Sequence, residues 1–201
     1  MVILKNDFNL IFKESIEESI TLKNETLIDK DLDKLFSLAE DIKNLIINGG
    51  KLFICGNGGS AADSQHLAAE LVVRLNKTFN RDPLPAYSLV PDSVCLTACA
   101  NDYDFENIFE RPLKSIGRNG DGLLLISTSG MSKNLIVVAK TAKELGIETF
   151  ALLGSDGGHL FKEVQKSYIV KSNDTARIQE LHILIEHTLA KFIEEAYFKT
   201  T

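Results

Sequence analysis

From residue 51 onward, short apolar runs alternate with longer segments of helical periodicity, and this alternation is the strongest constraint on the fold. It predicts strands at residues 51–55, 86–90, 122–127, 148–153 and 167–170. It predicts helices near residues 60–75, 92–100, 104–116, 132–145 and 175–198. Such a pattern is typical of a parallel sheet with helices on both faces. The run Leu123–Ile126 is continuously apolar, as expected of a central strand.

Two more helices are predicted before the first strand, at residues 5–22 and 31–48, from apolar residues three and four positions apart. We therefore expect an α/β, three-layer doubly wound fold with a five-stranded parallel sheet, preceded by two N-terminal helices. At 201 residues the chain is expected to form a single domain, residues 1–201. The first helix has no evident sheet face to cover, so we expect the helices of residues 5–48 to contact other subunits.

The charge balance argues against a nucleic-acid partner. The chain carries 22 basic and 28 acidic residues, a net charge of −6, with no cluster of lysine or arginine. No apolar run approaches the ~20 residues that span a bilayer, and the N-terminus does not resemble a secretion signal. We therefore expect no membrane contact and a cytoplasmic location. Cys55, Cys95 and Cys99 fit no metal-binding pair and are expected to be reduced and buried.

A glycine-rich turn lies between the first predicted strand and the helix after it, in the stretch CGNGGSAADSQHLAAE at residues 55–70. Free N–H groups at the start of such a helix can bind an anion. The turn also fits the loose nucleotide-binding pattern G-x-G-x-x-G/A. A dinucleotide site needs an acidic residue about 20 positions later. Residues 76–80 read NKTFN, and the first acid after the second predicted strand is Asp92, so this alternative is disfavoured.

The helix after the turn carries Asp63, His66 and Glu70 on one face. His66 and Glu70 are four residues apart, so their side chains are neighbours. The opposite face carries an apolar stripe of Leu67, Ala68, Leu71 and Leu75. The polar face is therefore not expected to fill the core, and it lies one to two turns beyond the candidate anion site.

Two other loops carry candidate binding residues. Ser127–Ser132, with the sequence STSGMS, offers four hydroxyl groups at the start of a helix and can hold a phosphate. The structural alternative is that one serine only caps that helix. Asn101 and Asp102 can either cap the helix that follows them or reach a sugar hydroxyl, and the sequence does not distinguish these roles.

The last predicted helix holds a second polar cluster. Its members are Arg177, Gln179, Glu180, His182, Glu186 and His187. The helix is apolar nearly all round, which predicts burial, and His182 fits a core histidine better than a ligand. Gln179 and His187 are eight residues apart, about 12 Å along the axis, whereas His182 and Glu186 have the tighter spacing of four. The spacing leaves open whether the histidines and glutamates bind a metal or form a metal-free acid/base site.

Taken together, GNGGSAADSQHLAAEL, STSGMS, Asn101–Asp102 and RIQELHILIEH resemble the sugar isomerase (SIS) domain family, and within it the phosphoheptose isomerases, over residues 5–198. The resemblance implies a sheet of flavodoxin-like order and a homotetramer with active sites at subunit interfaces. It implies aldose–ketose isomerisation of D-sedoheptulose 7-phosphate to D-glycero-D-manno-heptose 7-phosphate through an enediol. That reaction serves bacterial heptose biosynthesis for surface polysaccharide, such as lipopolysaccharide or capsule.

The same resemblance implies roles for individual residues. Glu70 and His187 would be the catalytic acid/base pair. One zinc ion per subunit would be held by His66, Glu70, Gln179 and His187. Substrate contacts would come from Asn57, Gly58, Gly59, Ser60, Glu70, Asn101, Asp102, Ser127, Thr128, Ser129, Ser132 and Gln179. Some members carry an acid before the Arg-Ile-Gln motif, but this chain has Ala176 there and Asp174 two residues earlier, so no role for that acid is carried over.

Two alternative functions remain compatible with the same resemblance. One branch of the family is a non-catalytic scaffold that binds the bacterial replication initiator, and it is expected to lack part of the ligand and acid/base set that is complete here. An isomerase of another sugar phosphate would need a similar phosphate site and similar enediol chemistry. Fold alone does not decide between these functions.

Overall fold

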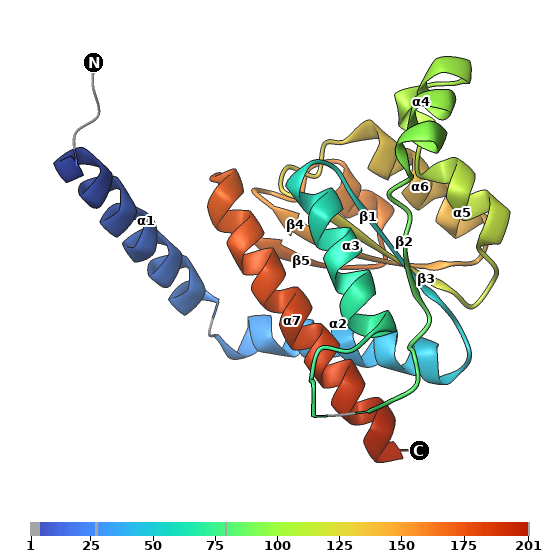
Figure 1. Ribbon diagram of the computed structural model, residues 1–201, viewed down its shortest axis with the longest axis horizontal. Coiled ribbons are helices and arrows are strands. Elements are labelled where there is room, and N and C mark those ends of the chain that lie inside the picture. The colour runs from blue at the N-terminus through green and yellow to red at the C-terminus, as the bar shows by residue number, and fades with distance from the viewer. Residues whose placement is uncertain (1–4, 27, 79, 201) are drawn as a thin grey trace.

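The computed structural model describes residues 5–26, 28–78 and 80–200 as a five-stranded parallel sheet covered by helices (Figure 1). The strands are β1 (Leu52–Gly56), β2 (Ala86–Ser88), β3 (Gly122–Ser127), β4 (Glu148–Gly154) and β5 (Lys166–Val170). The helices are α1 (Lys5–Glu25), α2 (Asp29–Ile47), α3 (Gly59–Val72), α4 (Ser93–Asp102), α5 (Glu110–Ile116), α6 (Lys133–Glu144) and α7 (Thr175–Thr200). The strand order β2-β1-β3-β4-β5 confirms the expected doubly wound, flavodoxin-like fold with two N-terminal helices.

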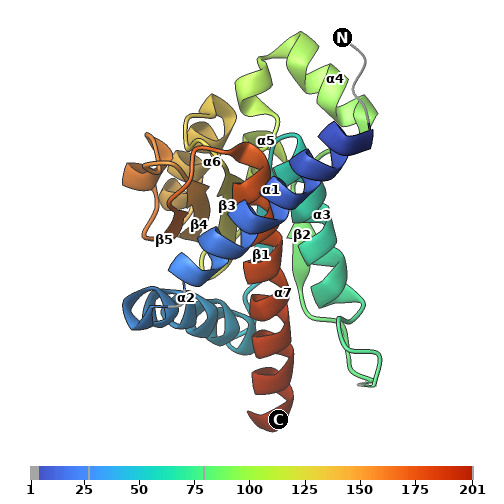
Figure 2. The same cartoon turned by 90° about the vertical axis from the view of Figure 1, so that its left-hand side faces the viewer.

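Two apolar clusters, one on each face of the sheet, form the core. Along β1, Leu52 and Ile54 join the cluster covered by α2, α3 and α7, whereas Phe53 and Cys55 join the one covered by α5 and α6. Figures 1 and 2 show these two groups of helices on opposite sides of the sheet. All six residues of β3 are buried, as its continuous apolar run predicts.

Two predicted elements differ from the structure. The helix expected over residues 104–116 is instead a short 3₁₀ turn, Phe105–Asn107, followed by α5. Pro112 lies in the first turn of α5, where a missing N–H costs little, so the helix begins close to it. The second strand ends at Ser88 rather than at residue 90, because Pro91 has no N–H to continue the ladder.

The carboxyl ends of β1 and β3 position the two candidate binding loops. Gly56 at the end of β1 pairs with Ile126 at the end of β3. The glycine turn follows the first of these residues, and the STSGMS loop begins immediately after the second. The two loops therefore leave the sheet side by side, at the edge where ligands bind in folds of this type.

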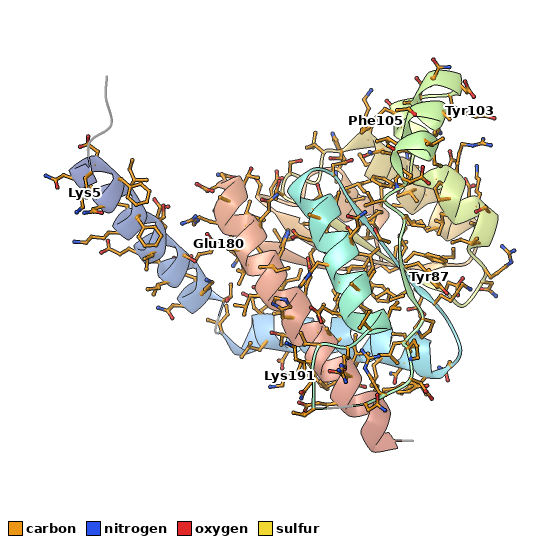
Figure 3. All side chains as sticks on the ribbon, in the orientation of Figure 1. Lys5, Tyr87, Tyr103, Phe105, Glu180 and Lys191 are labelled. Atoms are coloured by element: carbon orange, nitrogen blue, oxygen red, sulfur yellow. The ribbon has the colours of Figure 1, made fainter. Side chains whose placement is uncertain are left out.

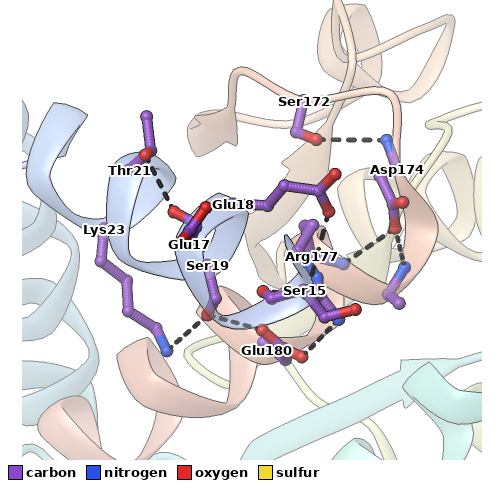
Figure 4. Close-up of polar contacts among 11 residues, drawn as sticks. Ser15, Glu17, Glu18, Ser19, Thr21, Lys23, Ser172, Asp174, Arg177 and Glu180 are labelled. Carbon is purple, nitrogen blue, oxygen red and sulfur yellow. Dashed lines mark hydrogen bonds and ion pairs between the residues drawn. The ribbon is translucent and has the colours of Figure 1, made fainter. Parts of the chain in front are cut away.

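Helix α1 stands away from the body of the molecule and touches α7 mainly through polar groups (Figures 1 and 4). The Arg177 guanidinium donates to the Ser15 carbonyl, and the Ser19 hydroxyl donates to Glu180 Oε2 at 2.7 Å. Figure 3 shows Glu180 on the side of α7 that faces α1. The apolar side chains that α1 leaves more than 40% exposed are Phe8, Leu10, Ile11, Phe12, Ile16 and Ile20.

Helix α7 is buried on most of its surface but not all round, so that expectation is wrong for one face. Leu184 is 45% exposed, and Thr188 beside it is also exposed. This face borders an apolar groove of about 400 Å³ between α2 and α7. Figure 1 shows α1 set apart from α7 along much of its length.

All three cysteines are free thiols, as expected. Cys55 and Cys99 are buried, and burial raises the pKa of the Cys55 thiol. Cys95 is exposed, so the prediction of burial is wrong for this residue, because α4 extends outward beyond the sheet and covers little else (Figure 2). Among the described residues, no helix is long and apolar enough to cross a membrane.

Candidate functional site

His66, Glu70 and His187 meet where α3 packs against α7. The two Nε2 atoms of His66 and His187 are 2.8 Å apart, and Glu70 Oε1 is 3.5 Å from His66 Nε2. The two imidazole rings meet edge to face. The i, i+4 spacing on α3 places His66 and Glu70 on one side of that helix, and His187 reaches them from 121 residues further along the chain.

This arrangement fits a bound cation. One ligand atom from each of the three residues lies within 4.8 Å of the other two. Donors around a tetrahedral zinc ion, each about 2.0–2.2 Å from the metal, are roughly 3–3.5 Å apart. Imidazole nitrogens and a carboxylate oxygen are ordinary zinc ligands. Without a cation, the short contact between the two imidazoles requires one ring to donate its Nε2–H to the other.

Gln179 lies beside the glycine turn, at a different level of α3 from these three residues. A Cβ atom added to Gly59 would come within 2.5 Å of Gln179 Nε2, so the amide of Gln179 packs directly against this glycine. Gly59 precedes His66 by seven residues, which is about 10 Å of helix. Within one chain, the Gln179 amide is therefore at the start of α3 and the three-residue cluster is two turns further on.

Three titratable groups on α3 and α7 have shifted pKa values: Glu186 and His182, which are buried, and Asp63, which is partly buried. Burial, reinforced by the nearby Asp63 carboxylate, raises the pKa of Glu186 to about 9. Burial also raises the pKa of Asp63, and the charge of His66 lowers it by less. His182 is fully buried and contacts the Leu153 carbonyl at 3.1 Å; burial lowers its pKa to about 4. The prediction of a core histidine is confirmed for His182.

The complete burial of Glu186 is not apparent from the sequence. Both of its carboxylate oxygens lack a hydrogen-bond partner among the described residues, and the side chain is 0% exposed. The spacing of four indicates that Glu186 and His182 share one face of α7. It does not indicate that this face is completely buried. With its pKa about 9, Glu186 is neutral at pH 7 and cannot act as a carboxylate base there.

The glycine turn is held by two reciprocal hydrogen bonds between side-chain amides. Asn57 and Asn134 each donate an Nδ2–H to the other's Oδ1, both at 2.9 Å. Gly58 has a φ of +58° and lies at the N-cap of α3, which has no side-chain cap. Asn134 comes from the first turn of α6, so this pair joins the glycine turn to the helix that follows the STSGMS loop. Ser60, also predicted to contact substrate, is buried within α3.

The hydroxyls of the STSGMS loop are not equivalent. Ser127 is 5% exposed and its Oγ accepts the Gly130 N–H at 3.0 Å, so it shapes the turn. Thr128 is half-buried and Ser129 is exposed. Ser132 occupies the N-cap position of α6 but makes no side-chain cap bond, so the alternative in which it serves only as a cap is not supported. Gly130 packs so closely on the Gly157 carbonyl that an added Cβ would lie 2.0 Å from it.

Asn101 and Asp102 form the end of α4, and Asn101 Nδ2 donates to Asp102 Oδ1 at 2.8 Å. The alternative in which they cap the next helix is wrong, because Asp104 and Phe109 occupy the N-cap positions that follow. Asp102 instead borders a cavity of about 380 Å³ together with Cys99 and Arg111. Within the part of the chain that the structure describes, no hydrogen bond or ion pair joins Asn101 or Asp102 to the cluster of His66, Glu70 and His187.

At the start of α7, Asp174 has the role of a helix cap. Its Oδ1 accepts the backbone N–H groups of Ala176 at 2.8 Å and Arg177 at 3.1 Å. Ala176 itself is exposed. The acid that this chain has near the Arg-Ile-Gln motif is therefore used to begin the helix that carries Gln179 and His187.

Comparisons with known proteins agree with this arrangement. A family model described as SIS domain matches residues 17–154. The phosphoheptose isomerase of Chlorobaculum parvum is 45% identical over 171 residues, which cover 85% of this chain and 82% of that protein. The corresponding protein of a Roseiflexus species is 41% identical over 186 residues, 92% of this chain and 93% of its own. The chain belongs to the phosphoheptose isomerases of the SIS domain family.

The solved structures of phosphoheptose isomerases extend this agreement to three dimensions. The structure of phosphoheptose isomerase GmhA from Neisseria gonorrhoeae superimposes with a TM-score of 0.85 at 38% sequence identity. The match covers 94% of this chain and 99% of that structure. Because the match leaves out only 6% of the chain, the structural likeness extends into α1 and α7, which lie partly or wholly outside the residues that the family model matches.

Proposed function

We propose that this chain is a sugar-phosphate isomerase that interconverts D-sedoheptulose 7-phosphate and D-glycero-D-manno-heptose 7-phosphate. The observation that carries the proposal is the convergence of Glu70 and His187 with His66 on α3 and α7, where α3 begins at a glycine turn suited to a phosphate. Phosphoheptose isomerases that are more than 40% identical over most of the chain supply the substrate class. The expected product is a heptose for surface polysaccharide.

The proposed chemistry moves a carbonyl group between two neighbouring carbons through an enediol. A single base must take a proton from one carbon and return it to the next, and the Glu70 carboxylate, which is 20% exposed, is accessible for this. His187 serves the hydroxyl protons. The N–H groups of the glycine turn and the hydroxyls of Thr128, Ser129 and Ser132 hold the phosphate.

We propose that His66, Glu70 and His187 hold one zinc ion per subunit, which supplies polarisation of the substrate carbonyl when bound. The spacing of their ligand atoms supports this assignment. Gln179 is the proposed fourth ligand. Its amide lies against Gly59 at the start of α3, about two turns of helix from the other three residues.

A homotetramer with active sites at subunit interfaces is part of the same proposal. The exposed apolar side of α1 and the apolar groove between α2 and α7 both offer surfaces that a second copy can cover. We also propose a cytoplasmic location, which is supported by the three free cysteines, because free thiols suit a reducing compartment.

The test is turnover of sedoheptulose 7-phosphate, followed by NMR, with and without added zinc. We expect the parent protein to form heptose 7-phosphate and both Glu70→Gln and His187→Gln to be at least ~100-fold slower, the usual minimum contribution of a general acid or base. Glu144→Gln, at an exposed position on α6, is the matched control. A folded parent protein that is inactive at every zinc level would contradict the proposal and favour another sugar phosphate or the scaffold function.

A further inference from the structure

Arg81 makes four hydrogen bonds that join the end of α3 to α7. Its Nη2 donates to the Glu70 carbonyl at 2.8 Å, and its Nη1 donates to the carbonyls of Leu71 at 2.8 Å and Asp82 at 3.1 Å. Its Nε donates to Glu194 Oε1 at 2.5 Å. The Arg81 and Glu194 side chains are 1% and 2% exposed, so this ion pair is shielded from water.

The guanidinium binds the backbone of a residue in the candidate site. The last carbonyls of a helix have no partner within the helix, and a cation there also opposes the helix dipole favourably. In α3, one of these carbonyls belongs to Glu70, whose side chain lies beside His66 and His187. Arg81 therefore fixes the backbone from which the proposed base extends.

The other end of the link is on the helix that carries His187. Glu194 follows His187 by seven residues, which is about two turns, so both lie on nearly the same side of α7. The second oxygen of Glu194 accepts the Asn76 N–H at 3.2 Å, which ties the loop after α3 to the same carboxylate. Contacts between α3 and α7 thus occur in order at Gly59 with Gln179, at His66 with His187, and at Glu70 with Glu194 through Arg81.

We propose that Arg81 and Glu194 are positioning residues that set the placement of Glu70 relative to His187. Neither touches the reacting atoms; they act through the backbone of α3 and through α7. This inference rests on the proposed function for its catalytic consequence. A base misplaced by about 1 Å can lose on the order of 100-fold in rate, so a weakened link is expected to lower kcat rather than substrate affinity.

The experiment compares Arg81→Lys and Glu194→Gln with Lys51→Met. Lysine keeps the charge, but a single ammonium cannot reach the Glu70 carbonyl, the Leu71 carbonyl and the carboxylate with the same geometry. Glutamine keeps the shape of Glu194 and removes its charge. Lys51→Met breaks a different partly buried ion pair, which joins Lys51, just before β1, to Asp121, just before β3. It is the control for a general loss of stability.

We expect at least a tenfold lower kcat in Arg81→Lys and Glu194→Gln, with KM within about threefold of the parent, and an unchanged kcat in Lys51→Met. The second readout is the imidazole NMR spectrum without substrate. The chain has four histidines, and we expect the signals of His66 and His187 to shift while that of the exposed His159 does not. Should Arg81→Lys fail to fold, Glu194→Gln decides the question by the same two readouts.

Parent-like kcat together with unshifted His66 and His187 signals in a folded variant would overturn the positioning role. Absence of turnover by the parent protein is a different result. It would count against the proposed function alone, and the imidazole spectra of the variants would then decide whether Arg81 and Glu194 set the geometry of the cluster.

Discussion

At the scale of single residues, the two hydrogen bonds between the amides of Asn57 and Asn134 can be removed to test what holds the glycine turn in place. In Asn134→Ala, both the Nδ2–H donor and the Oδ1 acceptor of the Asn57 side chain lose their partner. We expect a loss of about 1–3 kcal/mol in the free energy of unfolding, the usual cost of polar groups left unpaired. We also expect a higher KM for the sugar phosphate, because the turn that binds it is less firmly held.

Urea unfolding and steady-state kinetics measure these two effects. Asn134→Asp keeps the shape but presents only acceptors to the Asn57 oxygen when ionised, so it is expected to be at least as damaging. If Asn134→Ala unfolds at the same urea concentration as the parent, the amide pair does not stabilise the turn.

His182 predicts how stability depends on pH. Its pKa is about 4 in the folded protein, below its ordinary value of 6.5. The unfolded chain therefore binds a proton first as pH falls, and the contribution of His182 to stability is complete above pH 6.5 and lost between 6.5 and 4. At pH 5 the loss is expected to be about 2 kcal/mol relative to pH 7.

Unfolding by urea at a series of pH values between 7 and 5 checks this prediction, with His182→Gln as the comparison. Glu186, whose raised pKa acts in the opposite direction over this range, is present in both proteins, so the prediction concerns the difference between them. The variant is expected to be less stable overall, and between pH 7 and 5 the parent is expected to lose about 2 kcal/mol of unfolding free energy relative to it. Equal slopes in the two proteins would mean that His182 is not the group responsible.

The residues that could and could not be predicted differ in how far their partners lie along the chain. His66 and Glu70 follow from a spacing of four, and His187 follows from the resemblance to a known family. The role of Arg81 could not be predicted, because its partner Glu194 is 113 residues away. No local sequence pattern indicates that the two residues form a pair. The burial of Glu186 likewise depends on how α3 packs on α7, which periodicity within one helix does not specify.

At the scale of secondary-structure elements, Asp174 is expected to determine how firmly α7 begins. Its carboxylate accepts two N–H groups of the first turn. Removing the cap in Asp174→Ala is expected to cost about 1 kcal/mol of stability. Thermal unfolding measures the loss. Asp174→Asn can still accept these hydrogen bonds and is expected to keep most of the stability that the cap provides. A variant Asp174→Ala as stable as the parent would contradict the assignment.

The strands and long helices were predictable because each has a clear period and a clear breaker. The strand of residues 122–127 and its neighbours follow from apolar runs, and their positions agree with the structure to within one or two residues. The segment of residues 104–116 failed because its apolar spacing continues across a 3₁₀ turn. The 3₁₀ turn packs against α4 and α6, and Pro112 places the start of α5 after it.

At the scale of the whole molecule, the exposed apolar side of α1 predicts assembly. Four chains of 22.2 kDa each would give a particle of about 89 kDa. We expect light scattering to detect this species for the parent protein and a smaller one for the double variant Phe8→Asp with Phe12→Asp, because both rings are more than 55% exposed in the single chain. Lys13→Asp, which changes the charge of α1 without removing an apolar side chain, is the control.

Contact between α3 and α7 also has a consequence for the protein during its synthesis. His187 lies 121 residues after His66, so at typical rates of 5–20 residues per second roughly 6–24 s of translation separate the two. The first strands and α3 can emerge from the ribosome long before α7 exists. A nascent or prematurely terminated chain that lacks α7 therefore holds half of a reaction centre, and the complete one exists only after α7 has been made.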